Sequence, residues 1–378
     1  MWLADDRCGE IVEATWTSTE CPDPSSAILK KVAKCEQDLT WWNNNCFGNV
    51  RRKLADMKKL LAAVELEALR SGNNSQVRLL KAEVNVLIDR ESRLWSQRSK
   101  VLWLSKGDSN TKVFQSKATK RLWKNSILGI RDPSGRWLNQ SEDIGKAFIN
   151  YYIKLFSSSC PVSQCGALDK IPQVVTDEMN ADLVGVFQEW EILEAINQMV
   201  PLKALGPNGM PPLFYQHFWP VVDKDVTSSV LMWLNTGILP SPTNHTFITL
   251  IPKVNSPELV TEFRLISLCN VLYKIFSKVL ANRLKKFLPN LITEHQSAFA
   301  KDRLITDNIL VAFETLHCMK NQTSGKTVFM ALKLDMSKAY DRVEWTYLET
   351  LMLKMGFCAQ WISLIYGLCE ICHLLDFD

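Results

Sequence analysis

Two apolar seams between residues 50 and 94 constrain the fold of this chain more than any other feature. Apolar residues recur alternately four and three positions apart, which is the spacing of a helix that packs against a partner helix. The first seam comprises Val50, Leu54, Met57, Leu61, Val64 and Ala68, and the second comprises Val77, Leu80, Val84, Leu87 and Leu94. Gly72, Asn73 and Asn74 supply turn residues between them. The pattern predicts an antiparallel helical hairpin. We interpret this hairpin as a structural arm without a catalytic role.

The periodicity changes after this arm. The sequence Asp132-Pro133-Ser134-Gly135 has turn chemistry and stands between short strand-like stretches at residues 126–130 and 136–138. A helix is predicted over residues 144–155. Residues 157–173 are rich in Ser, Pro and Cys, and we interpret them as a linker.

The second half of the chain mixes strands with helices. Strands are predicted at residues 246–251, where Pro252 ends the run, and at residues 327–334, which have the composition of a buried strand. Helices are predicted at residues 270–287 and 344–355. Because both kinds of element share this half, we expect an α+β fold behind the helical arm.

Composition excludes several classes of protein. The chain has 378 residues and contains no apolar run near the ~18 residues that a transmembrane helix needs. The N-terminus shows no secretory leader, and the 11 cysteines form no regular disulfide framework. The 5 histidines include no pair at the spacing of zinc ligands. We therefore expect an intracellular protein, in the nucleus or cytoplasm, without a membrane partner.

The net charge of only +4 conceals an uneven distribution. Between residues 91 and 136 eleven basic residues accompany three acidic ones, with Trp95, Trp103, Phe114 and Trp123 among them. Cations interleaved with aromatic rings are typical of a surface that binds nucleic acid. The predicted contacts are Arg98, Lys100, Lys106, Lys112, Lys117, Lys120, Arg121 and Lys124. A solvated basic helix face is the alternative interpretation.

One carboxylate stands at the end of an apolar run. Residues 328–334 lead directly to Asp335, and a strand that ends there would present a ligand suited to a hard cation. The alternative is that Asp335 caps a helix, and Asp341 could cap the helix that follows it.

These residues carry a resemblance. Leu334-Asp335 followed by Ala339-Tyr340-Asp341 is similar to the first catalytic motif of reverse transcriptases. Further segments resemble the non-LTR (LINE-type) retrotransposon branch of that family in plants: residues 206–209 with Phe214-Tyr215, residues 251–253, residues 263–275, and residues 295–299 with Arg303, Asp307 and Asn308. The order of these motifs makes the resemblance specific. Residues 95–100 with residues 103–111 are similar to the segment that joins the endonuclease to the polymerase, and residues 1–16 resemble the end of that endonuclease.

The resemblance implies an RNA-directed DNA polymerase that copies an RNA template by two-metal nucleotidyl transfer. It implies that Asp335 binds the catalytic Mg²⁺ ions and that Tyr340 is the steric gate against a ribose 2′-hydroxyl. It also implies that Arg264 and Arg303 contact nucleotide phosphates or the template backbone, with surface or ion-paired arginines as the alternative. The expected partners are an RNA template and a DNA primer or target.

The chain departs from the family pattern in several places. Leu205 and Leu265 replace prolines, Asn208 replaces an aspartate, and Asp302 replaces a glycine whose position favours positive φ. The Tyr/Phe-x-Asp-Asp motif, which supplies the remaining metal carboxylates, and the thumb are both absent from the 378 residues. We therefore expect a truncated fragment without polymerase activity.

Two alternatives remain open for such a fragment. One is a non-catalytic remnant that binds RNA or single-stranded DNA. It would use the basic residues between 91 and 136 and those of the predicted helix at 270–287, which are Lys274, Lys278, Arg283, Lys285 and Lys286. The other is a protein-interaction remnant that uses the helical hairpin, with Leu54 and Leu61 as its test positions.

Four domains are predicted in sequence order. Residues 1–20 are a remnant of the endonuclease, and residues 21–125 are the helical arm. Residues 126–173 form a small hairpin, a helix and a linker. Residues 174–378 are the fingers and an incomplete palm of a reverse transcriptase domain.

Overall fold

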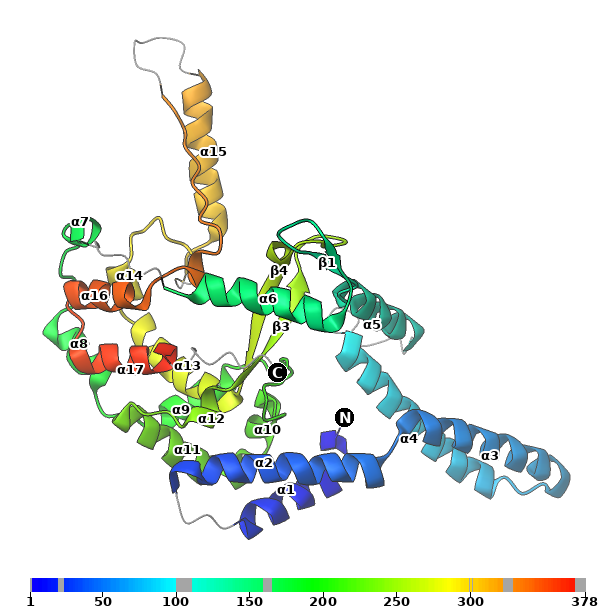
Figure 1. Ribbon diagram of the computed structural model, residues 1–378. Helices are drawn as coiled ribbons and strands as arrows, with labels where there is room; N and C mark the ends of the chain where they lie inside the picture. The colour runs from blue at the N-terminus through cyan, green and yellow to red at the C-terminus, as the bar shows by residue number, and fades with distance from the viewer. Residues whose placement is uncertain are drawn as a thin grey trace. The chain divides into compact units, whose positions relative to one another are not determined.

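The computed structural model describes residues 2–19, 24–99, 111–158, 165–298, 300, 302–321 and 329–370. The chain forms two compact units, whose elements are labelled in Figure 1. The first unit comprises Met1–Ala147, Met199–Ser229 and His245–Val271, and the second comprises Phe148–Gln198, Val230–Asn244 and Leu272–Asp378. Each unit is thus assembled from segments that are distant in the sequence. The sequential domain boundaries given above stay predictions.

Two amphipathic helices follow the short η1 (Trp2–Ala4) in the first unit, and they contact each other. They are α1 (Arg7–Ser18) and α2 (Pro24–Trp42). Each helix buries one apolar stripe: Cys8, Val12 and Trp16 on α1, and Ile28, Val32, Cys35, Leu39 and Trp42 on α2. A single π-helical turn, η2 (Asn43–Phe47), ends α2.

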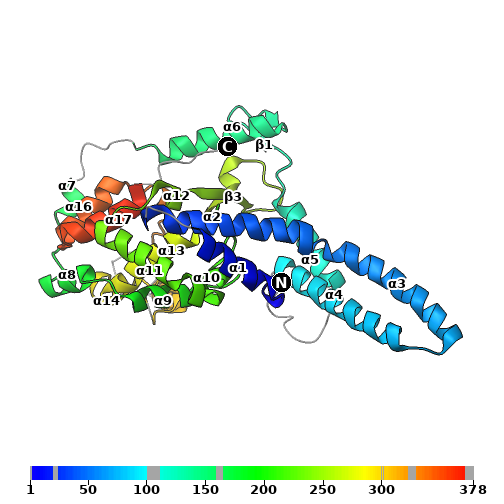
Figure 2. The same ribbon diagram turned by 90° about the horizontal axis from the view of Figure 1, so that it is seen from below.

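The predicted helical hairpin is confirmed. It consists of α3 (Val50–Ser71) and α4 (Ser75–Ser99), which lie side by side in both views (Figures 1 and 2). The Asn49 side chain caps α3 by accepting from the backbone N–H groups of Arg51 and Arg52. Gly72 ends the helix in the left-handed conformation, at φ 71°. The buried seam residues include Leu54, Ala68, Val77 and Val84.

A helix and a small hairpin come next in the first unit. The helix is α5 (Thr111–Asn125), and the hairpin joins β1 (Ile130–Arg131) to β2 (Trp137–Leu138) in antiparallel register. The predicted turn is confirmed, since Gly135 N–H bonds to Asp132 O at 2.9 Å. The predicted strand lengths were wrong. Pairing covers only Ile130 with Leu138 and Arg131 with Trp137. The Trp137 ring lies against Gly129, where a Cβ would come within 2.4 Å of it.

A longer antiparallel pair completes the first unit. The strands β3 (Thr246–Pro252) and β4 (Phe263–Cys269) pair along their full length, with Thr246 opposite Cys269 and Pro252 opposite Phe263. The 3-10 turn η3 (Val260–Glu262) leads into β4, and the short α10 (Pro212–His217) belongs to the same unit. The strand predicted over residues 246–251 is confirmed.

The second unit is helical. Its elements are α7 (Cys165–Leu168), α8 (Asp177–Val184), α9 (Glu189–Asn197), α12 (Ser241–Asn244), α14 (Leu288–Leu291), α15 (Ile305–Asn321), η4 (Ala339–Asp341), α16 (Trp345–Met355) and α17 (Ala359–Glu370). Three more helices contribute residues to both units: α6 (Ser141–Phe156), α11 (Trp219–Thr236) and α13 (Val271–Lys285). The helices predicted over residues 144–155, 270–287 and 344–355 are confirmed as α6, α13 and α16.

A buried ion pair joins α13 to α9 in the second unit. Arg283 of α13 donates from Nε and Nη2 to the Glu191 carboxylate of α9, at 2.7 and 2.8 Å. Its remaining bonds go to the carbonyl oxygens of Leu183, Gly185 and Val186, and its guanidinium lies 3.6 Å from the centroid of the Phe187 ring. The prediction that Arg283 belongs to a nucleic-acid surface was therefore wrong. Its N–H groups donate to the Glu191 carboxylate and to backbone carbonyls at the end of α8 and in the loop that follows it.

The strand predicted at residues 327–334 was also wrong where it can be judged. Residues 327 and 328 lie outside the described residues, and residues 329–334 form no strand. Phe329, Met330, Leu332 and Leu334 are all more than half exposed. A strand needs a neighbour for its backbone N–H and C=O groups, and within the described ranges no strand lies beside this segment.

The fold class is confirmed in its coarse form. Helices dominate, and the strands that the structure describes form two separate antiparallel pairs. Of the helices in the described ranges, none is long and apolar enough to cross a lipid bilayer. The division into an arm, fingers and an incomplete palm remains an interpretation of this arrangement.

Candidate functional site

Asp335 lies on an exposed loop in the second unit. It precedes η4, and the Tyr340 side chain in that turn is 82% exposed. The capping alternative was wrong for both aspartates, because the N-cap positions of η4 and α16 are Lys338 and Glu344. Asp335 is four residues before the first residue of η4, too far to cap it. Its carboxylate is therefore accessible from solvent.

Lys338 anchors the loop between Asp335 and Tyr340. Its ammonium group lies 5.6 Å from the centroid of the Tyr151 ring and 5.2 Å from that of Tyr152, both on α6. Its backbone is left-handed, at φ 57°. Burial raises the pKa of Tyr152 to about 12, with smaller contributions from Tyr151 and Asp341, so this phenol stays neutral under the ammonium. Contacts between residues so distant in sequence leave no local signal, and the sequence analysis missed Lys338.

The described residues do not by themselves fit a two-magnesium site. Two-ion phosphoryl transfer needs several oxygen ligands that hold the ions about 3.5–4 Å apart. Within the described ranges no three His, Cys, Asp or Glu side chains are grouped closely enough to hold a metal ion. Asp335 supplies one carboxylate of such a set, and the Mg²⁺ assignment stays a prediction.

Arg303 organises a second loop of the same unit. Its Nη1 donates to the carbonyl oxygens of Thr293 and Gln296, at 2.6 and 2.8 Å. The Asn308 amide donates to His295 O and Ser297 Oγ, at 2.9 and 3.0 Å. Asp302 has φ 61°, which confirms that this position needs a left-handed backbone. Arg303 thus has a structural role, and its contact with nucleotide phosphates stays a prediction.

Arg264 lies in the first unit, on β4 opposite Ile251, and is exposed. Two residues paired across the strands have their side chains on the same face of the sheet. Along one strand, every second residue is also on that face. Phe247 and Ile266 are therefore on the same face as Arg264, and both are exposed. Arg264 belongs to the first unit and the Asp335 loop to the second.

The glycine motif at residues 206–209 docks a loop on the end of β4. A Cβ at Gly206 would lie 2.5 Å from Cys269 O, so only glycine permits this approach. The Asn208 N–H donates to Asn270 Oδ1 at 3.1 Å, and the Asn270 amide donates to His245 O at 3.3 Å. The motif is explained by this backbone contact within the first unit.

The predicted nucleic-acid contacts divide among three places. Lys100 and Lys106 lie outside the described residues, as does Trp103. Arg98 lies in the last turn of α4, and its guanidinium lies 5.5 Å from the Trp95 ring centroid. The other five, Lys112, Lys117, Lys120, Arg121 and Lys124, are all exposed on α5. These roles stay predictions.

Comparison with known proteins confirms the reverse transcriptase resemblance. Residues 251–376 match the family "Reverse transcriptase (RNA-dependent DNA polymerase)". Over 384 aligned residues the chain is 27% identical to the "Transposon TX1 uncharacterized 149 kDa protein" of Xenopus laevis, and the alignment covers 96% of this chain. The chain spans 28% of the length of that relative. The family match contains Arg264, Arg303, Asp335 and Tyr340.

Proposed function

We propose that this chain is the fingers and first palm segment of an RNA-directed DNA polymerase from a non-LTR (LINE-type) retrotransposon. The observation that carries the proposal is the family match over residues 251–376, which contains the Asp335 and Tyr340 motif. The similarity to a transposon protein over 96% of the chain supports the retrotransposon source. The assignment to the plant branch rests on the motifs alone.

The exposed loop suits the roles proposed for its two residues. The Asp335 carboxylate is accessible, so it is available as one ligand of the Mg²⁺ ions that a complete site would hold. The Tyr340 ring is 82% exposed, and a ring of that volume beside a bound sugar would exclude a 2′-hydroxyl. Lys338, which lies between Asp335 and Tyr340, contacts the Tyr151 and Tyr152 rings of α6.

The two arginines are proposed to contact phosphates. Arg264 is exposed on the open face of the β3–β4 pair, where its guanidinium fork can reach a template backbone. Arg303 uses Nη1 for the Thr293 and Gln296 carbonyls, and a guanidinium has further N–H donors for a phosphate. Both residues would then contact phosphates of an RNA template or a DNA primer.

We further propose that the 378-residue chain alone does not polymerise DNA. No Tyr/Phe-x-Asp-Asp sequence occurs in it, and one carboxylate cannot hold two divalent ions. The chain would then bind template and primer without joining nucleotides.

A primer-extension assay combined with a binding assay tests both parts. The purified chain is mixed with an RNA template annealed to a DNA primer, deoxynucleotides and Mg²⁺ or Mn²⁺, beside a complete retroviral reverse transcriptase as positive control. We expect binding of the primer–template, measured by fluorescence anisotropy, and no extended primer. Extension by the pure chain would contradict the inactivity. Absence of any binding to primer–template would contradict the assignment to a polymerase.

A further inference from the structure

The basic residues between 91 and 136 are not equivalent in the structure. Three of them pair with carboxylates: Arg93 with Asp89 at 2.8 Å, Arg131 with Glu258 at 2.6 Å, and Arg136 with Asp132 at 3.4 Å. A carboxylate partner offsets part of the charge of a cation, so a paired cation attracts a phosphate less strongly than an unpaired one. These three arginines therefore contribute little to an anion-binding surface.

Helix α5 differs from the rest of this region. It carries Lys112, Lys117, Lys120, Arg121 and Lys124 and contains no acidic residue. In the part of the chain that the structure describes, Lys112, Lys120, Arg121 and Lys124 make no ion pair. The helix therefore presents a concentrated positive charge, which attracts a polyanion.

The exposed face of α5 also presents an aromatic ring. Phe114 is 3% exposed and lies on the buried side, whereas Trp123 is 72% exposed. Trp123 is three residues after Lys120, and Lys124 is four residues after Lys120. At 3.6 residues per turn, both therefore lie on the same face of the helix as Lys120. Trp95 of α4 is different, because the guanidinium of Arg51 lies 4.3 Å from its ring centroid and that of Arg98 lies 5.5 Å away.

We propose that this face, defined by Lys120, Trp123 and Lys124 with Lys112 and Arg121 beside it, binds single-stranded RNA. The cations would neutralise phosphates, and the Trp123 ring would stack on an unpaired base, which every base permits. Lys112 and Lys124 are about 18 Å apart along the helix at a rise of ~1.5 Å per residue, long enough for several nucleotides. The helix lies outside residues 251–376, the range of the family match, and the proposal rests on the proposed function only for its ligand class.

Salt-dependent binding of a labelled single-stranded RNA to the full chain tests the charges. For single strands, each neutralised phosphate contributes about −0.7 to the slope of log K against log salt concentration. We expect Lys120→Gln to make the slope less steep by about 0.7. Lys58→Gln is the matched control, because Lys58 is exposed on α3, and we expect no change there.

Substitution of the ring tests the stacking. We expect Trp123→Ala to weaken binding roughly 5- to 160-fold without changing the salt slope, since stacking is worth ~1–3 kcal/mol per base. Trp123→Phe should restore most of the affinity. Trp41→Ala is the control, because Trp41 is 62% exposed on α2. Circular dichroism checks that each variant is folded.

The outcomes separate this surface from the polymerase assignment. If Trp123→Ala binds RNA within twofold of the unmodified chain, the surface is overturned, and binding of primer–template by the same preparations keeps the polymerase proposal. If polyglutamate displaces the RNA as well as unlabelled RNA does, the face is a site for acidic protein and the proposal is overturned. If the chain fails to bind primer–template while Trp123→Ala still weakens RNA binding, the surface stands and the polymerase proposal falls.

Discussion

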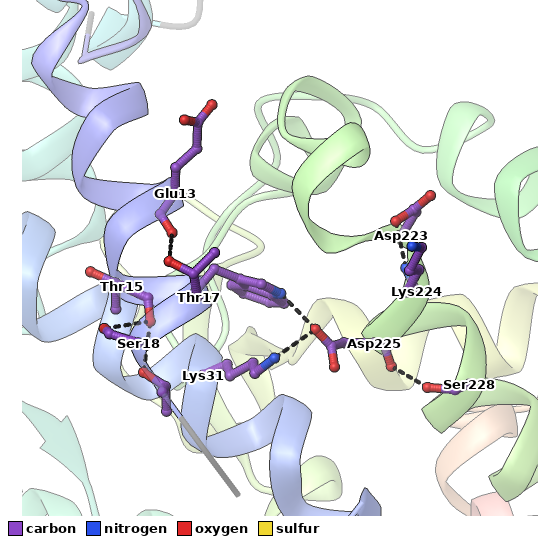
Figure 3. Close-up of polar contacts among 11 residues, drawn as sticks. Glu13, Thr15, Thr17, Ser18, Lys31, Asp223, Lys224, Asp225 and Ser228 are labelled. Carbon is purple, nitrogen blue, oxygen red and sulfur yellow. Dashed lines mark hydrogen bonds and ion pairs between the residues drawn. The ribbon is translucent and has the colours of Figure 1, made fainter.

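The indole N–H of Trp16 donates a 2.7 Å hydrogen bond to the carboxylate of Asp225, 209 residues further along the chain. Lys31 donates to the same carboxylate at 2.8 Å, and its ammonium lies 5.6 Å from the Trp16 ring centroid. Figure 3 shows Lys31 and Asp225 pointing toward each other. One carboxylate thus joins α1, α2 and α11 within the first unit. The N-terminal segment is an integral part of that unit, whatever its evolutionary origin.

We expect Asp225→Asn to lower the free energy of unfolding by about 1–2 kcal/mol, because a hydrogen-bonded charge partner of Lys31 is lost. Urea unfolding measures the change. Asp223→Asn is the control on the same helix. The Asp223 carboxylate accepts a hydrogen bond from the backbone N–H of Lys224, and among the described residues it makes no hydrogen bond or ion pair with α1 or α2. An equal effect from both variants would show that the bond between helices contributes nothing.

Gly206→Ala should destabilise the first unit by more than ~2 kcal/mol, because a Cβ placed 2.5 Å from Cys269 O forces the loop away from β4. The backbone N–H of Asn208 would then lose its bond to Asn270. Gly145→Ala is the contrasting variant, since nothing lies within 4 Å of a Cβ built at this position in α6. Alanine is the better helix former there, so we expect a gain of up to ~1 kcal/mol. Thermal unfolding that shifts both variants in the same direction would contradict the account.

The buried pair of Glu191 and Arg283 predicts a dependence of stability on pH. Burial would raise the pKa of Glu191, but the bonds from Arg283 and from the Gln188 N–H outweigh it and hold this pKa below its usual value. The folded state therefore favours the carboxylate. Its contribution is complete above the unfolded pKa of about 4.3 and is lost as pH falls through the lower folded value.

Urea unfolding between pH 6 and pH 3 measures this contribution. We expect the unmodified chain to lose more stability over this interval than Glu191→Gln, which has no carboxylate to protonate. At pH 6 the substitution itself should cost about 3–5 kcal/mol, because it leaves the buried Arg283 without its counterion. Glu189→Gln, at an exposed position in the same helix, should follow the unmodified chain. Parallel pH profiles for the Glu191→Gln variant and the unmodified chain would refute the prediction.

Asp302 allows a test of backbone conformation. Its φ of 61° is left-handed, where a Cβ costs about 1 kcal/mol or more relative to glycine. Asp302→Gly should therefore be more stable than Asp302→Ala by about 1 kcal/mol. At Glu314, in the middle of α15 and exposed, the order should reverse by about 0.5–1 kcal/mol, because glycine weakens a helix. The same order at both positions, measured by chemical unfolding, would rule out the conformational explanation.

Local patterns predicted much of the secondary structure correctly. The two seams that contain Leu54 and Val84, the turn at Gly135 and the strand before Pro252 each depend on neighbouring residues, and each is confirmed. The segment that leads to Asp335 shows the limit of such patterns. Its residues have strand composition, but a strand forms only with a neighbour, and composition does not reveal whether a neighbour is present.

The sequence by itself determined the helical arm, the order of the motifs and the reverse transcriptase resemblance, because periodicity and spacing are local properties of the chain. The tertiary structure decided which charges are available. Arg283 and Lys120 look alike in sequence, yet Arg283 is buried against Glu191 while Lys120 lies exposed beside Trp123. Packing brings an anion to one cation and leaves the other in solvent, and that depends on contacts between residues far apart in the chain.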